Sequence, residues 1–256
     1  MITWPVDLTV YAGLIALFLG HAWLASTVTD AQRKHTFYFG LGLLVLWLAL
    51  ETPLDTISDY YLDSVHMVQH VLLGFVAPPL MLLGLSSQMA GRIVRVPGVR
   101  AVTEPVPALV IASLVMIVWH IPTFYDATLY SGSLHVLEHL MFIAAGVLMY
   151  WPIIEATSAH AHWRMSPGAE LLYMLVATLP QDGVALALIF SRVPFYEYYT
   201  HVPRLIPSLT PVIDQTIAGA VLMILGKATL AVAAIAVFTR WFGADHRADQ
   251  ARAVTS

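Results

Sequence analysis

The sequence predicts an all-α fold, a polytopic membrane bundle of seven transmembrane helices, with the N-terminus outside and the C-terminus in the cytoplasm. Three observations predict it. Hydrophobic residues make up 59% of the 256 positions and charged residues only 11%, and the mean hydropathy is +0.75. Apolar runs of near-spanning length follow one another along the chain, and basic residues gather in alternate loops. Because a soluble domain carries roughly a quarter charged residues, lipid suits this surface better than water.

The length of the apolar runs fixes the expected elements. A span needs ~20 mainly apolar residues, since the hydrocarbon core is ~30 Å thick. The expected spans are 6–25, 36–52, 64–84, 105–125, 133–154, 170–190 and 212–238. We expect them to form one domain over residues 1–242, followed by a polar cytoplasmic tail at 243–256. The first run is interpreted as a retained helix, because no basic residue precedes it and no signal-cleavage pattern follows it.

The basic residues predict the orientation. The loops expected on one side hold most of them: Arg33, Lys34, Arg92, Arg95, Arg100, Arg164, and in the tail Arg240, Arg247 and Arg252. The opposite loops hold only Arg192 and Arg204, while Lys227 lies within the last run. By the positive-inside rule, the arginine-rich side is cytoplasmic.

Composition also restricts the function. The chain has no cysteine, which excludes disulfides, thiolate metal sites and cysteine nucleophiles. A net charge of −4 without a basic stripe gives no sign of a nucleic-acid partner. Any metal held by side chains must therefore use His, Met, Asp or Glu.

Five histidines lie inside the third, fourth and fifth expected spans: His66, His70, His120, His135 and His139. The first two and the last two are each spaced i,i+4, so each pair shares a helix face. Counting along helices of alternating direction places both pairs ~3 and ~9 Å, and His120 ~7 Å, below the outer end. Three helices thus deliver five imidazoles to one layer near the outer surface.

Other polar residues are expected to support this layer. Gln69, Met67 and Glu138 fall at the same depth, and the Pro180-Gln-Asp182-Gly break in the sixth span brings a carboxylate into the bundle. We expect Asp182 to orient a histidine through a hydrogen bond. A single intramembrane histidine is most often a satisfied packing group, but polar side chains within spans usually face the bundle interior. Five in one layer favour a metal site.

Imidazole suits zinc, copper, iron and nickel. The absence of cysteine and the presence of Met67 and Met116 lean toward copper. A site that faces outward would exchange its metal with the periplasm or the cell exterior.

These motifs resemble a known family. His66-Met-Val-Gln-His70, Trp119-His120-Ile-Pro122, Leu134-His135-Val-Leu-Glu-His139, Trp151-Pro152 and Leu179-Pro-Gln-Asp182 are similar to those of the multi-span CtaG family of bacterial cytochrome c oxidase assembly factors. The resemblance covers about residues 60 to 230. It implies a multi-pass protein of the bacterial cytoplasmic membrane, with the haem–copper oxidase membrane subunit as partner and an extracytoplasmic copper donor as a possible second one. It also implies a metallochaperone role, with the five histidines at the metal site and Asp182 as their support.

Two enzyme or cofactor alternatives stay open. His135-Val-Leu-Glu138-His139 matches the H-x-x-E-H pattern of inverted zincins, in which two histidines bind zinc and the glutamate activates water. A zinc-dependent membrane hydrolase is therefore the first alternative to a non-enzymatic role. The second is a b-type cytochrome, because two histidines on facing helices can ligate haem axially. A scaffold that contacts the oxidase without a metal of its own is a third reading.

Overall fold

The structure is a computed structural model that describes residues 4–155 and 161–255. Within these residues it contains helices and no strand, which confirms the all-α prediction. Five helices are long and apolar enough to cross a membrane on their own, and two bent pairs raise the number to as many as seven. Each of the seven expected spans overlaps one of these helices or bent pairs.

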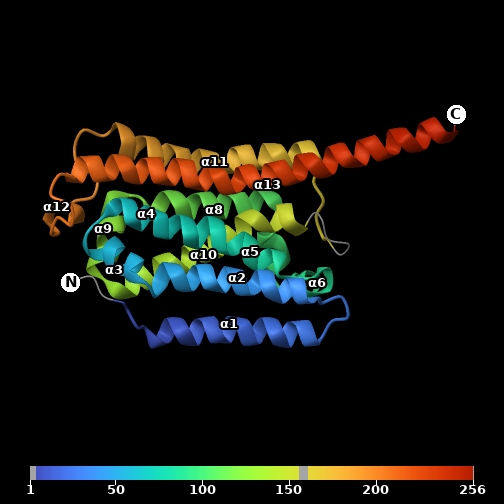
Figure 1. Cartoon of the computed structure of the whole chain (residues 1–256), viewed down its shortest axis with the longest axis horizontal. Coiled ribbons are helices and arrows are strands. Elements are labelled where there is room, and N and C mark those ends of the chain that lie inside the picture. The colour runs from blue at the N-terminus through green and yellow to red at the C-terminus, as the bar shows by residue number, and fades with distance from the viewer. Residues whose placement is uncertain (1–3, 156–160, 256) are drawn as a thin grey trace.

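The first bent pair explains the short second span. Helix α1 (Leu8–Ser26) lies at the edge of the bundle beside α2 (Arg33–Leu50) (Figure 1). After α2 the chain bends by 46° into α3 (Pro53–Tyr60). Thr52 caps α3, because its hydroxyl accepts the amide hydrogen of Leu54 and Pro53 is favoured in the first turn.

The third expected span is one rod with a wide turn in it. It consists of α4 (Asp63–Val71), the π-helical turn η1 (Leu72–Val76) and α5 (Ala77–Leu83). Pro78 and Pro79 supply no amide hydrogen just after the wide turn, so the regular ladder is interrupted there. Gly146 of the fifth span packs on this turn so closely that a Cβ would overlap the carbonyl oxygen of Gly74. This close approach sets the distance between the two rods that carry the histidine pairs.

The fourth expected span is broken rather than straight. After the short helices α6 (Ser87–Ile93) and α7 (Val99–Val102), α8 runs over Pro105–Trp119 and α9 over Pro122–Tyr130. The two long pieces meet at 71°. A continuous helix to residue 125 was therefore wrong, because Pro122 lacks an amide hydrogen and disfavours helical geometry at the residue before it.

The remaining helices complete the bundle. They are α10 (Gly132–Glu155), α11 (Pro167–Phe190), the short α12 (Tyr198–His201) and α13 (Pro211–Thr255). The segment expected as a polar tail from residue 243 continues the backbone of α13 as far as Thr255, beyond the body of the bundle (Figure 1). Position 256 lies outside the described residues.

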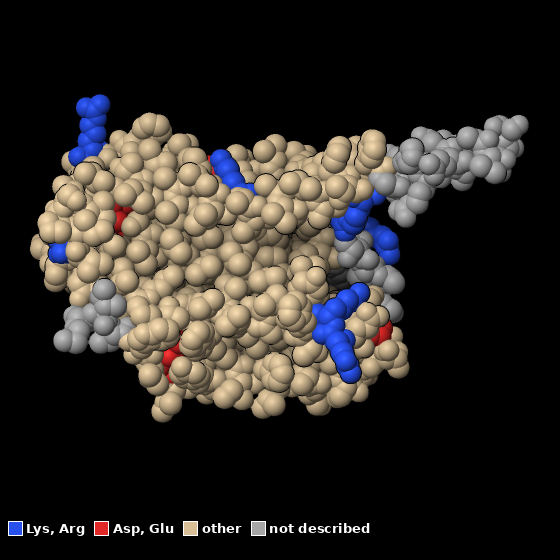
Figure 2. All heavy atoms as spheres, viewed as in Figure 1, with Lys and Arg blue, Asp and Glu red and all other residues tan. Residues whose placement is uncertain are grey.

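The two ends of the bundle differ in charge. Helices α3, α9 and α12 lie at one end, while α6 and the extension of α13 lie at the other (Figure 1). Figure 2 shows Lys and Arg side chains gathering at the α6 end, with the long flanks of the bundle almost free of charge. The apolar flanks are what a lipid-facing surface requires.

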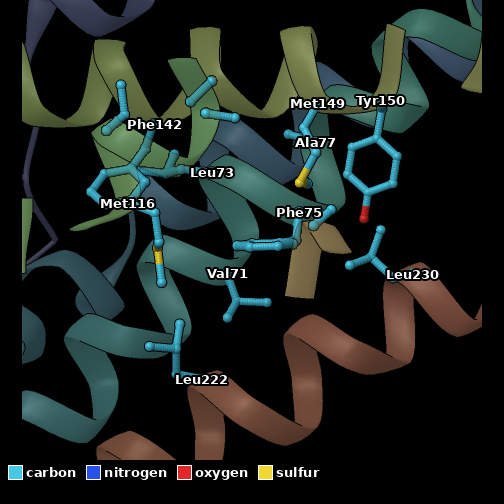
Figure 3. Close-up of a cluster of buried hydrophobic side chains, with 14 of the residues drawn as sticks. Val71, Leu73, Phe75, Ala77, Met116, Phe142, Met149, Tyr150, Leu222 and Leu230 are labelled. Atoms are coloured by element: carbon cyan, nitrogen blue, oxygen red, sulfur yellow. The ribbon is translucent and has the colours of Figure 1, made fainter. Parts of the chain in front are cut away.

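The hydrophobic core fills the middle of the bundle. Figure 3 shows Leu73 and Phe75 between Phe142 and Met149 of α10 on one side and Leu222 of α13 on the other. Leu73 and Leu222 are completely buried. The histidines lie in the same rods as this core, toward the α3 and α9 end.

Candidate metal centre

The structure brings the five predicted histidines together in one buried cluster. His66 and His70 come from α4, His135 and His139 from α10, and His120 from the junction of α8 and α9. Ring centroids are 4.3 Å apart within the first pair and 4.1 Å within the second. The ring of His66 lies 5.4 Å from that of His135, and the ring of His70 lies 5.5 Å from that of His120. Each of the five residues exposes no more than 9% of its surface.

Four residues of this cluster have the arrangement of a metal-ligand group. One ligand atom each from His66, His135, Glu138 and His139 lies within 4.8 Å of all the others. Residues 135, 138 and 139 share a helix face by their spacing, and His66 meets them from α4. Glu138, expected from the sequence as a support, thus stands among the potential ligands, while His70 and His120 adjoin the group on its α8 side.

A tyrosine fixes the tautomer of His66. The hydroxyl of Tyr199 donates to the carbonyl oxygen of Ser58 at 2.6 Å. Its oxygen is then free to accept, and Nδ1 of His66 lies 3.0 Å away. The imidazole hydrogen therefore resides on Nδ1, and Nε2 carries a bare lone pair that faces the cluster.

The tautomer of His120 is fixed by its own helix, again with the hydrogen on Nδ1. Its Nδ1 lies 2.7 Å from the carbonyl oxygen of Met116, which can only accept. The hydrogen is therefore on Nδ1, and Nε2 is a buried lone pair without a protein partner among the described residues. Tyr196 holds the backbone of the same residue by donating to the carbonyl of His120 at 3.2 Å.

A carboxylate from α3 orients His135. Oδ2 of Asp59 lies 3.5 Å from Nδ1 of His135. This contact favours a hydrogen on Nδ1 and leaves Nε2, which has no other described partner, as a lone pair. A carboxylate behind a histidine is a common way of orienting metal-ligating imidazoles and raising their basicity.

His70 links the two parts of the cluster. Its Nε2 lies 2.8 Å from Nε2 of His66. Because the hydrogen of His66 is on Nδ1, His70 supplies the hydrogen of this contact in the metal-free protein. Nδ1 of His70 is then a further buried lone pair, without a partner among the described residues.

The cluster therefore holds several buried polar atoms that have no hydrogen-bond partner. The unpartnered atoms of the described cluster are Nδ1 of His70, Nε2 of His120, Nε2 of His135, Nε2 of His139 and both carboxyl oxygens of Glu138. An unsatisfied buried polar group costs about 1–3 kcal/mol. Such a concentration is expected where an ion or water normally completes the site.

Gln69, expected as a support of the histidines, bonds instead to the elements around the cluster. Its amide donates to the carbonyl of Ala49 at 2.9 Å and to Asp55 at 2.8 Å, while its oxygen accepts from Ser58 at 3.0 Å. These bonds tie α2 and α3 to α4. They place α3, and with it Asp59, over the end of the cluster that points away from the hydrophobic core.

Two predicted supports lie elsewhere. Asp182 does not bond to a histidine; its Oδ1 pairs with Nζ of Lys227 on α13 at 3.0 Å. The expectation was wrong because α11 turns this carboxylate toward α13. Met67 is fully buried and belongs to the hydrophobic core. Asp214 of α13 accepts the amide hydrogens of Asp63 and Ser64, so it caps α4 from another helix.

Sequence reasoning missed Asp59 and Tyr199 as orienting residues. Asp59 was visible only as one of a series of acids between the second and third spans. Tyr199 lies 133 positions from His66, in the short helix α12 of a connection whose tyrosines suit a membrane interface as well. Neither pairing has a local sequence signal.

Taken together, the fold and the site define a helical membrane protein with a buried histidine–glutamate cluster near one end of the bundle. Comparison with known proteins agrees with this class. A model of the cytochrome c oxidase caa3 assembly factor family, Caa3_CtaG, matches residues 16–244, and the chain belongs to this family.

Curated relatives add little about function. The chain is 25% identical to uncharacterized proteins of Mycobacterium bovis and Mycobacterium tuberculosis, over 95% of its own length and 40% of theirs. An uncharacterized protein of Mycobacterium leprae is 25% identical over 92% of this chain and 39% of its own length. The chain thus spans about two fifths of these relatives. No solved structure matches it.

Proposed function

We propose that this protein is a metallochaperone of the bacterial cytoplasmic membrane that binds copper in the histidine cluster and helps deliver it to the membrane subunit of a haem–copper cytochrome c oxidase. In this proposal copper is cargo, and the protein is not an enzyme. The chain crosses the membrane seven times, with the cluster at the outer side and the arginine-rich α6 end in the cytoplasm. An extracytoplasmic donor supplies the copper.

The observation that carries the proposal is the convergence of ligand atoms from His66, His135, Glu138 and His139 within 4.8 Å of one another. Ligands about 2 Å from an ion lie ~3 Å apart, so small rotations of these side chains suffice to close the site. The hydrogens on His66 and His135 already point away from it, toward Tyr199 and Asp59. Pre-set tautomers lower the cost of binding a metal.

The choice of copper rests on ligand chemistry and on the family. Three imidazoles and a carboxylate bind copper more tightly than most divalent metals of the first transition row. An oxidase assembly role supplies a reason for copper over zinc. His70 and His120 stand next to the group with free lone pairs, so the ion has alternative ligands on its way out, as transfer requires.

Metal titration of the purified protein tests the proposal. The wild type should bind copper, and the His66→Ala/His70→Ala and His135→Ala/His139→Ala variants should lose the bound ion. His21→Ala is the matched control, because His21 is also buried but bonds to the carbonyl of Gly84, which follows α5 at the opposite end of the rod from the cluster. Unchanged copper stoichiometry in both double variants would refute the proposal.

Oxidase maturation provides the second readout. Cells that carry either double variant should assemble oxidase with reduced copper content, whereas cells with His21→Ala should not. Full maturation with both double variants would favour the scaffold role without a metal.

One observation favours the zinc hydrolase as the second candidate. The carboxyl group of Glu138 is fully buried beside His135 and His139 and makes no direct hydrogen bond among the described residues, although Nε2 of His70 lies 3.7 Å from its Oε1; a general base is held near a metal-bound water in this way. Metal retention with loss of a hydrolytic activity in Glu138→Gln would support this candidate.

A further inference from the structure

A hollow on the outer end of the bundle adjoins the cluster. It measures about 520 Å³ and opens to the exterior of the molecule. Its walls come from three separate parts of the chain, namely the N-terminal segment, α3 and the loop after α12. The lining residues are Pro5, Asp55, Thr56, Asp59, Tyr60, Tyr61, Val202 and Pro203.

The hollow is held open by buried polar contacts. Glu51, which is almost completely buried, accepts the backbone amide hydrogen of Asp7 at 3.1 Å and so fixes the N-terminal segment beside α3. Gln69 fixes the other wall by donating to Asp55 at 2.8 Å. The walls therefore belong to the folded bundle.

Two carboxyl groups of α3 line the hollow. Asp55 and Asp59 are spaced i,i+4 on α3, so both project from one face of this helix. Both line the hollow, and no Lys or Arg is among its lining residues. The basic residues of the outer loops are Arg192 and Arg204, and the guanidinium of Arg204 bonds to the carbonyl of Tyr199.

Asp59 connects the hollow to the buried cluster. The same carboxylate that lines the hollow lies 3.5 Å from Nδ1 of His135. His135 is nine-tenths buried, and its other ring nitrogen is an unpartnered lone pair within the ligand group. The hollow is therefore separated from the proposed copper site by one imidazole ring, while the other oxygen of Asp59 accepts from the hydroxyl of Ser58 at 3.1 Å.

We infer that this hollow is a cation-capture site, in which Asp55 and Asp59 take up a hydrated divalent cation from the outer solution and pass it to the histidine cluster. The inference rests on the proposed function of the cluster. Carboxylate oxygens are hard ligands, which suit divalent ions better than the soft monovalent copper ion. The site therefore takes copper in its divalent form. A negatively charged cleft raises the association rate of a cation by one or more orders of magnitude.

The experiment compares the rate and the endpoint of loading. Metal-free full-length protein is mixed with Cu²⁺, and binding is followed in time at low and at high salt. Asp55→Asn keeps an oxygen that can accept the hydrogen bond from Gln69 but removes the charge. The inference predicts loading at least tenfold slower in this variant at low salt, a smaller difference at high salt, and an unchanged amount of bound copper at equilibrium.

Three comparisons make the result specific. Glu197→Gln is the matched control, since Glu197 is an exposed outer acid that does not line the hollow, and it should load at the wild-type rate. Asp55→Glu should restore fast loading. Asp59→Asn should slow loading as well and also weaken equilibrium binding, because it removes the partner of His135.

The outcomes separate this inference from the proposed function. Wild-type loading rates in both Asp55→Asn and Asp59→Asn would overturn the capture site while leaving the copper cluster intact. Equal slowing by Glu197→Gln would overturn it too, since general surface charge would then explain the effect. A wild-type protein that binds no copper at all would refute the proposed function itself.

Discussion

The two halves of the same rods, an outer half toward α3 and α9 and an inner half toward α6, follow opposite rules. In α4 the outer turns present His66 and His70, whereas the following turns of the rod present Leu73 and Phe75. In α10 the outer turns carry His135 and His139, and the inner turns carry Met149. Both halves are buried, but the inner half fills its space with apolar atoms (Figure 3), while the outer half leaves lone pairs without partners.

This difference separates stability from function. Close packing in the inner half holds the rods in register, as van der Waals contact does in membrane bundles generally. The unpartnered polar atoms of the outer half lower the stability of the metal-free protein, and they become useful only when a ligand binds to them. Substitutions in the two halves should therefore have opposite signatures in stability and in metal binding.

The largest expected effect is on stability, from Leu73→Ala. Leu73 is fully buried in the inner half, and truncation of such a leucine costs about 2–5 kcal/mol through the cavity it leaves. The variant should unfold at a lower temperature yet bind the same amount of copper. Leu175→Ala is the control, because Leu175 is 63% exposed on the lipid-facing side of α11 and should change little. Lost copper stoichiometry in a folded Leu73→Ala variant would contradict the separation.

Glu138→Met should have the opposite effect on the metal-free protein. The substitution removes a buried carboxyl group whose oxygens have no described hydrogen-bond partner, a cost of about 1–3 kcal/mol. The metal-free variant should therefore melt at a higher temperature than the wild type, and added copper should stabilise it less.

The same substitution of glutamate by methionine at Glu170, whose carboxylate is paired, is the matched comparison. Glu170 is also buried, but it accepts from Arg240 at 3.1 Å. Glu170→Met should lower the melting temperature because it leaves the arginine without this partner. If both glutamate variants shift the melting temperature in the same direction, the unpaired carboxyl group of Glu138 does not destabilise the metal-free protein.

These comparisons also show which features of the fold and the site can be predicted from the sequence. The i,i+4 spacing and the alternating helix direction placed five histidines in one layer, and the structure brings them together. The third span, expected at 64–84, is the rod Asp63–Leu83. The bend before Pro122 was within reach of the sequence, because proline restricts its neighbour as well as itself.

Long-range pairings were beyond the reach of the sequence. Asp182 was expected beside a histidine because its depth fitted, but depth along a helix does not fix the direction of a side chain, and it faces Lys227. The orienting partners Asp59 and Tyr199 reach the cluster from a capping helix and from a distant loop. Such contacts depend on the lateral packing and the axial rotation of the helices. Hydrophobic periodicity does not determine either of them.

Tyr199→Phe tests the orienting contacts. The variant keeps the ring but removes the hydroxyl that fixes the hydrogen of His66 on Nδ1. Loss of such a support lowers metal affinity about 10–100-fold, so the dissociation constant should rise by this factor with unchanged stoichiometry. Tyr173→Phe, whose hydroxyl donates to the carbonyl of Met149, should leave affinity as it is. Equal affinities in the two variants would show that His66 does not depend on Tyr199.

The smallest expected effect concerns pH at the opposite end of the bundle. Burial alone would raise the pKa of Asp30, but hydrogen bonds from the hydroxyl of Ser86 and the amide of Gln88 outweigh it and lower this pKa below 3.8. The stabilisation is therefore present above the unfolded-state pKa and disappears as the pH falls through the lower folded-state value.

Unfolding of the wild type and Asp30→Asn at pH 6 and pH 3 measures this contribution. The variant should be less stable by up to about 1 kcal/mol at pH 6, and the gap should narrow at pH 3. A gap that widens in acid would contradict the sign of the pKa shift.

The position of a bound ion is the most direct test of the central claim. Crystals of the copper-loaded protein, measured at the copper absorption edge, locate the metal without assumption about its ligands. The account predicts an ion about 2.0–2.2 Å from nitrogens of His66, His135 and His139, with Glu138 beside it and Tyr199 still bonded to His66. Copper found only outside this cluster, or a loaded protein with no anomalous peak among these side chains, would contradict the account.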